Sequence, residues 1–273
     1  MAQQQSRTND MSDLLLTTRQ DAITTLTLNR PAQRNALSRD LMAALQRELD
    51  AIATDKSIKV VILAANGPGF CAGHDLREMT AARSHDDRGR DFFAATMREC
   101  SALMQTIVTL PQPVIARVHG IATAAGCQLV ASCDLAIATE AARFATPGVN
   151  IGLFCSTPMV ALSRNVARKH AMEMLLTGDM VSASRAVELG LINRAVAPDL
   201  LDSEIASLAA LIASKSGHTL KIGKRAFYQQ LEMPLSEAYD FASRVMVENM
   251  LAHDAEEGIN AFLEKRAPEW QDR

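Results

Sequence analysis

Two kinds of hydrophobic pattern alternate along the first two thirds of the chain. Short runs rich in apolar and β-branched residues predict strands, and they stand at residues 23–28, 60–65, 114–118 and 135–138. In the other pattern, apolar residues recur at helical spacing, as in Leu41, Leu45 and Leu49 after the N-cap candidate Ser38. The alternation predicts an α/β core.

The pattern changes toward the C-terminal third. A second long helix is predicted over residues 93–107, stopped before Pro111. From Thr157 onward the pattern is mostly helical, with one late short strand at 192–196. The polar stretch 81–91 predicts a mobile surface loop, and loops of this kind also border substrate sites. We therefore expect an α/β core followed by a helical section.

Composition narrows the classes of function. The chain has 273 residues, 48% of them hydrophobic and 22% charged, with a net charge of −3. No overall basic field favours nucleic acid or an anionic membrane, and no apolar run approaches the ~20 residues of a membrane span. Six scattered histidines without an H-x-x-x-H pattern predict no metal site. Five cysteines without a C-x-x-C pair predict reduced thiols.

The N-terminus carries neither of two common targeting patterns. Residues 1–10 have no apolar core for secretion and no Arg-rich amphipathic pattern, so we expect residues 1–12 to be a disordered tail. Cytoplasmic localisation is expected, or the mitochondrial matrix if the source is eukaryotic.

Two segments of small residues stand where a strand ends and a helix is expected to begin. They are residues 69–76 (GFCAGHDL) and 119–129 (HGIATAAGCQL). Small side chains let a ligand approach the main chain, and N–H groups at a helix start lack intrahelical partners. Two such bends could aim two donors at one oxygen, as in an oxyanion hole. Each bend alone is a common packing device.

The two segments, in this order, belong to a longer series of motifs. The chain resembles the crotonase superfamily, also called the enoyl-CoA hydratase/isomerase family, from about residue 14 to the C-terminus. The matching motifs are LNRP (28–31), NAL (35–37), FCAGHDL (70–76), GCQL (126–129), SCD (132–134), FATP (144–147), NIGL (150–153) and AFLEKR (261–266).

The resemblance implies a fold and a ligand. The fold is a spiral of strand-strand-helix units, which we place at residues 13–205. Helices at 206–273 would build a homo-trimer, often a dimer of trimers, and contact coenzyme A. The ligand is an acyl-CoA thioester, with coenzyme A arriving as part of the substrate and no covalently bound cofactor. Neither a nucleic acid nor a membrane is expected as a partner.

The resemblance also implies site residues. The thioester carbonyl would accept hydrogen bonds from the main-chain N–H groups of His74 and Ala125. Arg34 and Ala72 match positions along the coenzyme. Phe262 and Lys265 match residues that contact the coenzyme from a C-terminal helix, often that of a neighbouring subunit, although an ordinary amphipathic end helix would show the same pattern.

The chain departs from the family at the positions that move protons. Hydratases of the family use two glutamates, which match Gln128 and Gly148 here, and isomerases use the second of them. An aspartate used by a dienoyl isomerase and a dehalogenase matches Ser156. Glutamine has no titratable carboxyl. Glycine is expected to leave a hole that admits water or a bulkier acyl group. One branch of the family shares these replacements.

Other side chains near the predicted site have simpler interpretations. The family uses the main chain of His74, and an acid/base role for its imidazole is the less favoured alternative. Asp75 is expected to cap the following helix. Cys155 is expected to be buried or neutral, because no neighbouring base is visible. Gln128 could orient a water or hydrogen-bond the acyl group.

Together these residues predict an acyl-CoA-binding protein of the enoyl-CoA hydratase or isomerase type with weak or unusual hydratase activity. A placed acid or base contributes about 10²–10⁴-fold, so losing both leaves mainly binding and polarisation. Two alternatives stay open: a non-catalytic acyl-CoA binder with a regulatory role, and a thioester hydrolase or C–C lyase with another proton donor.

Overall fold

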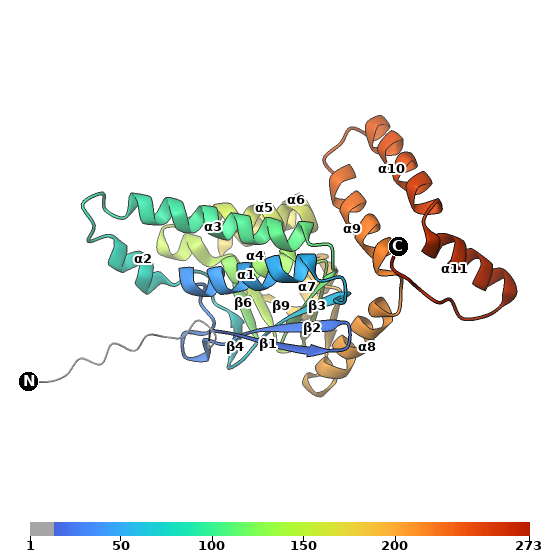
Figure 1. Ribbon diagram of the computed structural model, residues 1–273. Coiled ribbons are helices and arrows are strands. Elements are labelled where there is room, and N and C mark those ends of the chain that lie inside the picture. Colours follow the sequence, from blue (N-terminus) through green and yellow to red (C-terminus); the bar gives the residue numbers. More distant parts are fainter. Residues whose placement is uncertain (1–13) are drawn as a thin grey trace, which may run out of the picture.

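The computed structural model describes residues 14–273, and the predicted tail at 1–12 lies outside them. A six-stranded sheet has the order β1-β2-β3-β5-β7-β10, parallel except for the β1–β2 pair (Figure 1). Its strands are β1 (Leu15–Gln20), β2 (Ile23–Leu28), β3 (Val60–Ala65), β5 (Val114–Val118), β7 (Leu135–Thr139) and β10 (Arg194–Val196).

A second sheet of short strands has the order β4-β6-β8-β9. Its strands are β4 (Gly69–Cys71), β6 (Ile121–Thr123), β8 (Arg143–Ala145) and β9 (Val181–Ser182). The strands β3, β5 and β7 each lie in the first sheet, and the next strand along the chain lies in the second. Helices follow each such pair, so the expected strand-strand-helix units are present.

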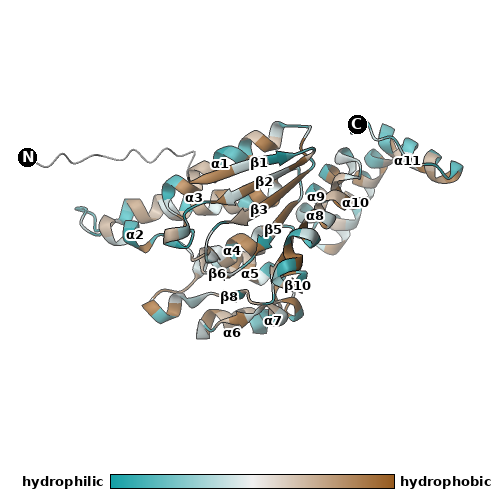
Figure 2. Cartoon of the chain, turned by 90° about the horizontal axis from the view of Figure 1, so that it is seen from below, coloured by the Kyte–Doolittle hydropathy of each residue, from teal (hydrophilic) through white to brown (hydrophobic). Residues whose placement is uncertain are grey.

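Helices cover both faces of the large sheet. The core side carries α1 (Arg39–Thr54), α3 (Arg90–Thr109) and α4 (Ala125–Ser132), and the opposite face is covered by α8 (Leu201–Ala213). Because parallel strands here are buried on both faces, β3 is apolar throughout: Val61 and Leu63 pack into the main core, whereas Val60 and Ile62 pack toward α8. Figure 2 shows this apolar character in β3.

Four shorter helices complete the spiral. They are α2 (Leu76–Ala82), α5 (Ser156–Asn165), α6 (Arg168–Thr177) and α7 (Ala183–Glu188). Short 3₁₀ turns lie at η2 (Pro31–Gln33), η3 (Pro147–Ile151) and η4 (Pro198–Leu200). Within residues 14–273, no helix combines the length and the apolar character needed to cross a membrane.

The C-terminal helices form an arm that projects from this core (Figure 1). It consists of α9 (Gly217–Gln230), α10 (Leu235–Met250) and α11 (His253–Glu264). The Lys224 ammonium group is buried and donates to the carbonyls of Ile107 and Gln112 and to Asp134 Oδ2 at 2.6 Å. The Tyr228 hydroxyl donates to Asp134 Oδ1 at 2.9 Å. These contacts anchor the base of the arm.

The predicted strands and helices are confirmed, with additions. The four predicted strands in the first part of the chain are β2, β3, β5 and β7, and Ser38 accepts from the Leu41 N–H as an N-cap. The late strand is β10. The structure adds β1 and the whole second sheet. The helix expected after Asp75 is α2, and α2 and α3 shorten the predicted loop at 81–91. Helix α8 spans the proposed boundary at 205/206 and packs on the sheet.

Candidate active site

The first bend follows β4 and is fixed by the segment after β2. The Ala72 N–H donates to the Arg34 carbonyl at 3.0 Å, and the Leu37 N–H donates to the Gly73 carbonyl at 2.7 Å. The Asp75 N–H donates back to Leu37 at 3.1 Å. The bend is therefore held as a short parallel bridge, and its shape does not depend on a ligand.

The side chains of Asn35 and Asp75 stabilise this bridge by hydrogen bonds. Asn35 is fully buried, and its amide nitrogen donates to the carbonyls of Asn66 and Gly69 at 2.8 and 2.9 Å. Asp75 caps α2 as predicted, accepting from the Arg77 N–H at 3.0 Å and from the Arg30 guanidinium at 2.9 Å. Burial opposes ionisation of Asp75, but these hydrogen bonds outweigh it and lower its pKa.

The second bend joins β6 to α4 through a strained residue. Ala124 has φ 51° and ψ −119°, a combination that glycine adopts far more readily. Its N–H donates to the Ala145 carbonyl at 2.9 Å, which holds the conformation. All eight residues of α4 are buried, so the helix starts inside the protein.

Two glycines bring the bends into contact. A Cβ at Gly126 would lie 2.1 Å from the carbonyl oxygen of Cys71, and a Cβ at Gly73 would lie 3.5 Å from the Ala125 nitrogen. Gly73 also has φ +97°, so it needs glycine on conformational grounds. Within residues 14–273, neither the His74 nor the Ala125 N–H donates to another main-chain group outside helices and strands. Ala125 is the first residue of α4, and an N–H at this position has no acceptor within the helix.

The imidazole of His74 is enclosed. Both ring nitrogens are buried and have no hydrogen-bond partner among the described residues. Burial lowers the pKa of His74, against a smaller opposing effect of the Leu37 carbonyl. The ring is therefore neutral at neutral pH.

The two positions expected to match the family's glutamates differ in their surroundings. Gln128 lies on α4 and is 4% exposed, with its side-chain oxygen 4.0 Å from the Cys100 sulfur. At Gly148 the expected hole is wrong, because an added Cβ would meet the Leu153 carbonyl oxygen at 2.7 Å and the Cys155 sulfur at 2.9 Å. The chain after η3 occupies the space where a side chain would stand.

Neither Cys155 nor Ser156, which follow Gly148 in the chain, is set up as a nucleophile. Cys155 is buried, and burial raises the pKa of its thiol, so the predicted neutral cysteine is confirmed. Ser156 begins α5, and its hydroxyl donates to the Phe154 carbonyl at 3.4 Å. Cys127 and Cys133 pack in the main core as expected.

The remaining predicted site residues lie at the surface. Arg34 and Ala72 are exposed on adjoining segments, joined by the hydrogen bond described above. Phe262 is 82% exposed on α11, and Lys265 ends that helix in a left-handed conformation. Helix α11 lies at the far end of the arm, away from α2 and α4 (Figure 1). Neither residue reaches the bends of its own chain.

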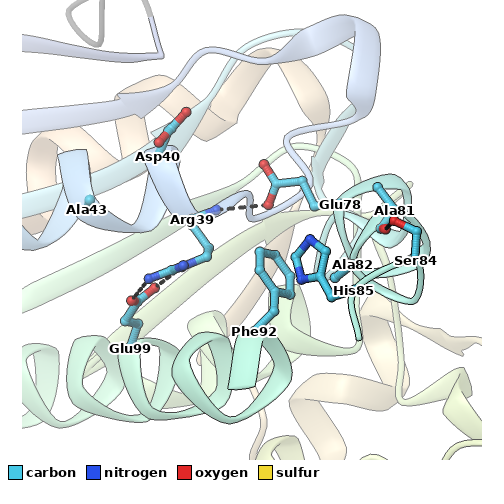
Figure 3. Close-up of a pocket in the computed structure, with 10 residues that line it drawn as sticks. All are labelled: Arg39, Asp40, Ala43, Glu78, Ala81, Ala82, Ser84, His85, Phe92 and Glu99. Carbon is cyan, nitrogen blue, oxygen red and sulfur yellow. Dashed lines mark hydrogen bonds and ion pairs between the residues drawn. The ribbon is translucent and has the colours of Figure 1, made fainter. Parts of the chain in front are cut away.

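A separate pocket of about 650 Å³ lies between α1, α2 and α3 (Figure 3). Arg39 forms a bidentate ion pair with Glu99 and places its guanidinium 5.6 Å from the Phe92 ring centre. The main-chain N–H of Arg39 donates to the Glu78 carboxylate at 3.1 Å. Burial raises the pKa of Glu78. The charges pair with one another and tie three helices together, and no residue of the two bends lines this pocket.

Two features of this site were not predicted from the sequence. The first is the role of Arg30 and Asn35, which fix the first bend from 45 and 34 positions away in the chain. Both lie within motifs quoted above, LNRP and NAL, and this was the sequence signal that could have indicated their role. The strain at Ala124 leaves no trace in the sequence, because alanine rarely marks a left-handed position.

Comparisons with known proteins follow the same motifs. A profile of the enoyl-CoA hydratase/isomerase family matches residues 18–273. The mitochondrial enoyl-CoA hydratase domain-containing protein 3 of Rattus norvegicus is 47% identical over 257 residues, covering 94% of this chain and 84% of that protein. This is the branch expected from the motifs around Gln128 and Gly148, so that expectation is confirmed.

Solved structures agree with the fold. An enoyl-CoA hydratase of Mycobacterium smegmatis gives a TM-score of 0.90 at 53% identity, covering 94% of this chain and 98% of that one. Human enoyl-CoA hydratase domain-containing protein 3 gives a TM-score of 0.90 at 46% identity, covering 94% and 100%. The chain therefore belongs to the enoyl-CoA hydratase/isomerase family.

Proposed function

We propose that the protein binds an acyl-CoA thioester and holds its carbonyl oxygen between the main-chain N–H groups of His74 and Ala125. The observation that carries this proposal is the contact between the two bends through Gly73 and Gly126. Within residues 14–273, neither amide donates to a main-chain acceptor outside helices and strands. Negative charge on the oxygen of an enolate would be stabilised there. One such donor is worth about 10²–10³ in rate.

The reaction class that fits is enolate chemistry of the hydratase or isomerase type, at a rate far below that of a two-glutamate hydratase. Neither Gln128 nor Gly148 has a side chain that can donate or accept a proton as an acid or base at neutral pH. A placed acid or base raises the rate by about 10²–10⁴-fold. The exposed apolar side chains of Leu153 and Phe154, beside Gly148, support an apolar acyl group.

A non-catalytic acyl-CoA binder with a regulatory role is the second candidate. It is favoured by the packing at Gly148, where the chain itself fills the position of a catalytic side chain. Measured turnover on crotonyl-CoA separates the two candidates, because a binder retains affinity and shows no product.

The arm supports a homo-trimer or dimer of trimers. Its helices bury almost no apolar side chain within one chain: α9 buries none and α10 buries only Ala238. Leu235, Leu251 and Phe262 are 76%, 78% and 82% exposed, and such surfaces mark association sites. A neighbouring copy would bring its Phe262 and Lys265 to the coenzyme. Phe262→Asp is expected to give smaller particles in sedimentation velocity.

The compartment stays a prediction. Cytoplasmic localisation was expected from the sequence, with the mitochondrial matrix as the alternative for a eukaryotic source. The rat relative is named as a mitochondrial protein, which fits that alternative.

The direct test uses crotonyl-CoA labelled with ¹³C at the carbonyl carbon. Calorimetry is expected to show binding, and the carbonyl resonance of the bound thioester is expected to move downfield because two N–H donors polarise it. Free coenzyme A, which lacks the carbonyl, serves as the control for binding of the nucleotide part alone. Absence of binding, or a bound resonance at the position of the free thioester, would overturn the proposal.

A further inference from the structure

The peptide group that carries the His74 N–H is held at its carbonyl side. This group joins Gly73 to His74, and its oxygen accepts from the Leu37 N–H at 2.7 Å. In a trans peptide the C=O and the N–H lie in one plane and point in opposite directions. The hydrogen bond from Leu37 therefore sets the direction of the His74 N–H, which points away from Leu37.

A second peptide group precedes this one in the same series of hydrogen bonds. The Leu37 N–H shares its peptide group with the Ala36 carbonyl, and that carbonyl accepts from the Arg30 guanidinium. Each of the two peptide groups therefore accepts at its oxygen and points its N–H to the opposite side. The series begins at the Arg30 guanidinium and ends at the His74 N–H.

The charge at the start of this series is largely shielded from solvent. The side chains of Arg30 and Asp75 are 15% and 9% exposed, and they form an ion pair at 2.9 Å. Partly buried charges are screened by salt much less than exposed ones. The main chain of Arg30 is also fixed, because its N–H donates to the Asn35 side chain at 2.8 Å and its carbonyl accepts from the Asn35 N–H at 2.9 Å. The guanidinium is therefore held in place beside the Ala36 carbonyl.

The second proposed donor has a neutral group at the corresponding position. The Ala125 N–H shares its peptide group with the Ala124 carbonyl, which accepts from the Gln128 N–H at 3.0 Å. This hydrogen bond at the start of α4 orients the Ala125 N–H in the same way. Its donor is a main-chain amide, whereas the series that ends at His74 starts from a cation.

We propose that Arg30 is a positioning residue that orients and polarises the His74 N–H through these two peptide groups. The inference rests on the proposed function, and it gives Arg30 no contact with the substrate. A hydrogen bond to a charged group is roughly twice as strong as one between neutral groups, and hydrogen bonds in series strengthen one another by about 10–30% per bond. A cation at the start of the series therefore makes the N–H at its end a stronger donor to an oxyanion.

The test measures the carbonyl resonance of bound crotonyl-CoA, labelled with ¹³C at the carbonyl carbon, in variants of Arg30. Arg30→Gln removes the charge and keeps hydrogen-bonding groups, so the resonance is expected to lose about 10–30% or more of the downfield displacement that binding causes in the parent. Arg30→Lys keeps the charge, and its resonance is expected to lie closer to that of the parent. Affinity for free coenzyme A, which lacks the carbonyl, is expected to be that of the parent in both variants.

Asp75→Asn distinguishes polarisation from a purely structural role of the ion pair. Asparagine caps a helix about as well as aspartate, so α2 keeps its N-cap, while the Arg30 charge loses its counter-ion. The resonance is therefore expected to move farther downfield, opposite to the change in Arg30→Gln. An ion pair that acts only by holding the bend would move the resonance upfield in both variants. Arg39→Gln is the matched control, because Arg39 forms its ion pair in the separate pocket, and it is expected to leave the resonance unchanged.

The outcomes separate this inference from the proposed function. If the parent binds no crotonyl-CoA, or binds it without displacing the resonance, the proposed function fails and the inference fails with it. If the parent displaces the resonance and Arg30→Gln does so equally, or if Asp75→Asn shifts it upfield, the role of Arg30 is refuted while the proposed function stands. Thermal unfolding checks the fold of each variant, and if Arg30→Gln does not fold, the direction of the shift in Asp75→Asn decides alone.

Discussion

Replacing Gly148 should destabilise the protein, although this position is expected to match a glutamate of the family's hydratases. A Cβ at this position would lie 2.7 Å from the Leu153 carbonyl oxygen and 2.9 Å from the Cys155 sulfur, inside van der Waals contact. One of the partners is main chain, so relief requires the segment after η3 to move. Overpacking of this kind costs about 1–3 kcal/mol. For a chain of this size each kcal/mol lowers Tm by ~2–4 °C.

The assay is thermal and urea unfolding of Gly148→Ala beside the parent. Gly223→Ala is the matched control, because Gly223 lies on α9 with no atom within 4 Å of an added Cβ, and alanine favours a helix by about 1 kcal/mol. The two substitutions should therefore change Tm in opposite directions. A Gly148→Ala protein as stable as the parent would refute the steric reasoning.

The same contacts bear on restoring hydratase chemistry. Gln128→Glu alone introduces a carboxyl on a well-packed helix, whereas adding Gly148→Glu also forces the segment after η3 aside. The single variant is expected to hydrate crotonyl-CoA at least as fast as the double variant. A double variant that is both stable and faster would show that this segment moves freely.

Three further predictions concern the rest of the chain. Ala124→Gly should stabilise the protein by about 0.5–1 kcal/mol, because glycine relieves the left-handed strain, and a urea titration measures it. Lys224→Met should lower the free energy of unfolding by about 3 kcal/mol in the same titration, because it leaves the largely buried Asp134 without its cation. An unchanged urea midpoint would contradict the role of this ion pair in anchoring the arm. Burial opposes ionisation of Asp254, but hydrogen bonds outweigh it and lower its pKa below the unfolded value. Its contribution is therefore complete above about pH 4 and is lost as the pH falls through the lower folded pKa. Asp254→Asn should accordingly flatten the acid limb of stability measured by circular dichroism.

Sequence patterns predicted the large sheet because its strands carry strong local signals. The run at 60–65 is wholly apolar, as expected of a strand buried on both faces. Ser38 and Asp75 are typical N-cap residues, and they mark the starts of α1 and α2. The second sheet was missed because strands of two or three residues, such as β8 and β9, are too short to show a period of two.

The two bends of the candidate site follow from the sequence, whereas the packing around them does not. Glycines at 73 and 126 marked the two bends, because close approach of main chain to main chain leaves no room for a side chain. The filled position at Gly148 depends on how the segment at 153–155 folds back, and the burial of the His74 ring nitrogens depends on tertiary packing. Neither leaves a local pattern in the sequence.

The contacts of Asp134 with Lys224 and Tyr228 connect the arm to α4, at whose first residue the thioester is proposed to bind. Asp134 follows the last turn of α4, whose first residue is Ala125, and eight helical residues span about 12 Å. A tilt of α9 transmitted through Lys224 would therefore reach Ala125, the proposed oxyanion donor, along the one helix α4. Subunit association and thioester affinity should then be thermodynamically linked, so affinity should rise with protein concentration across the range in which subunits assemble.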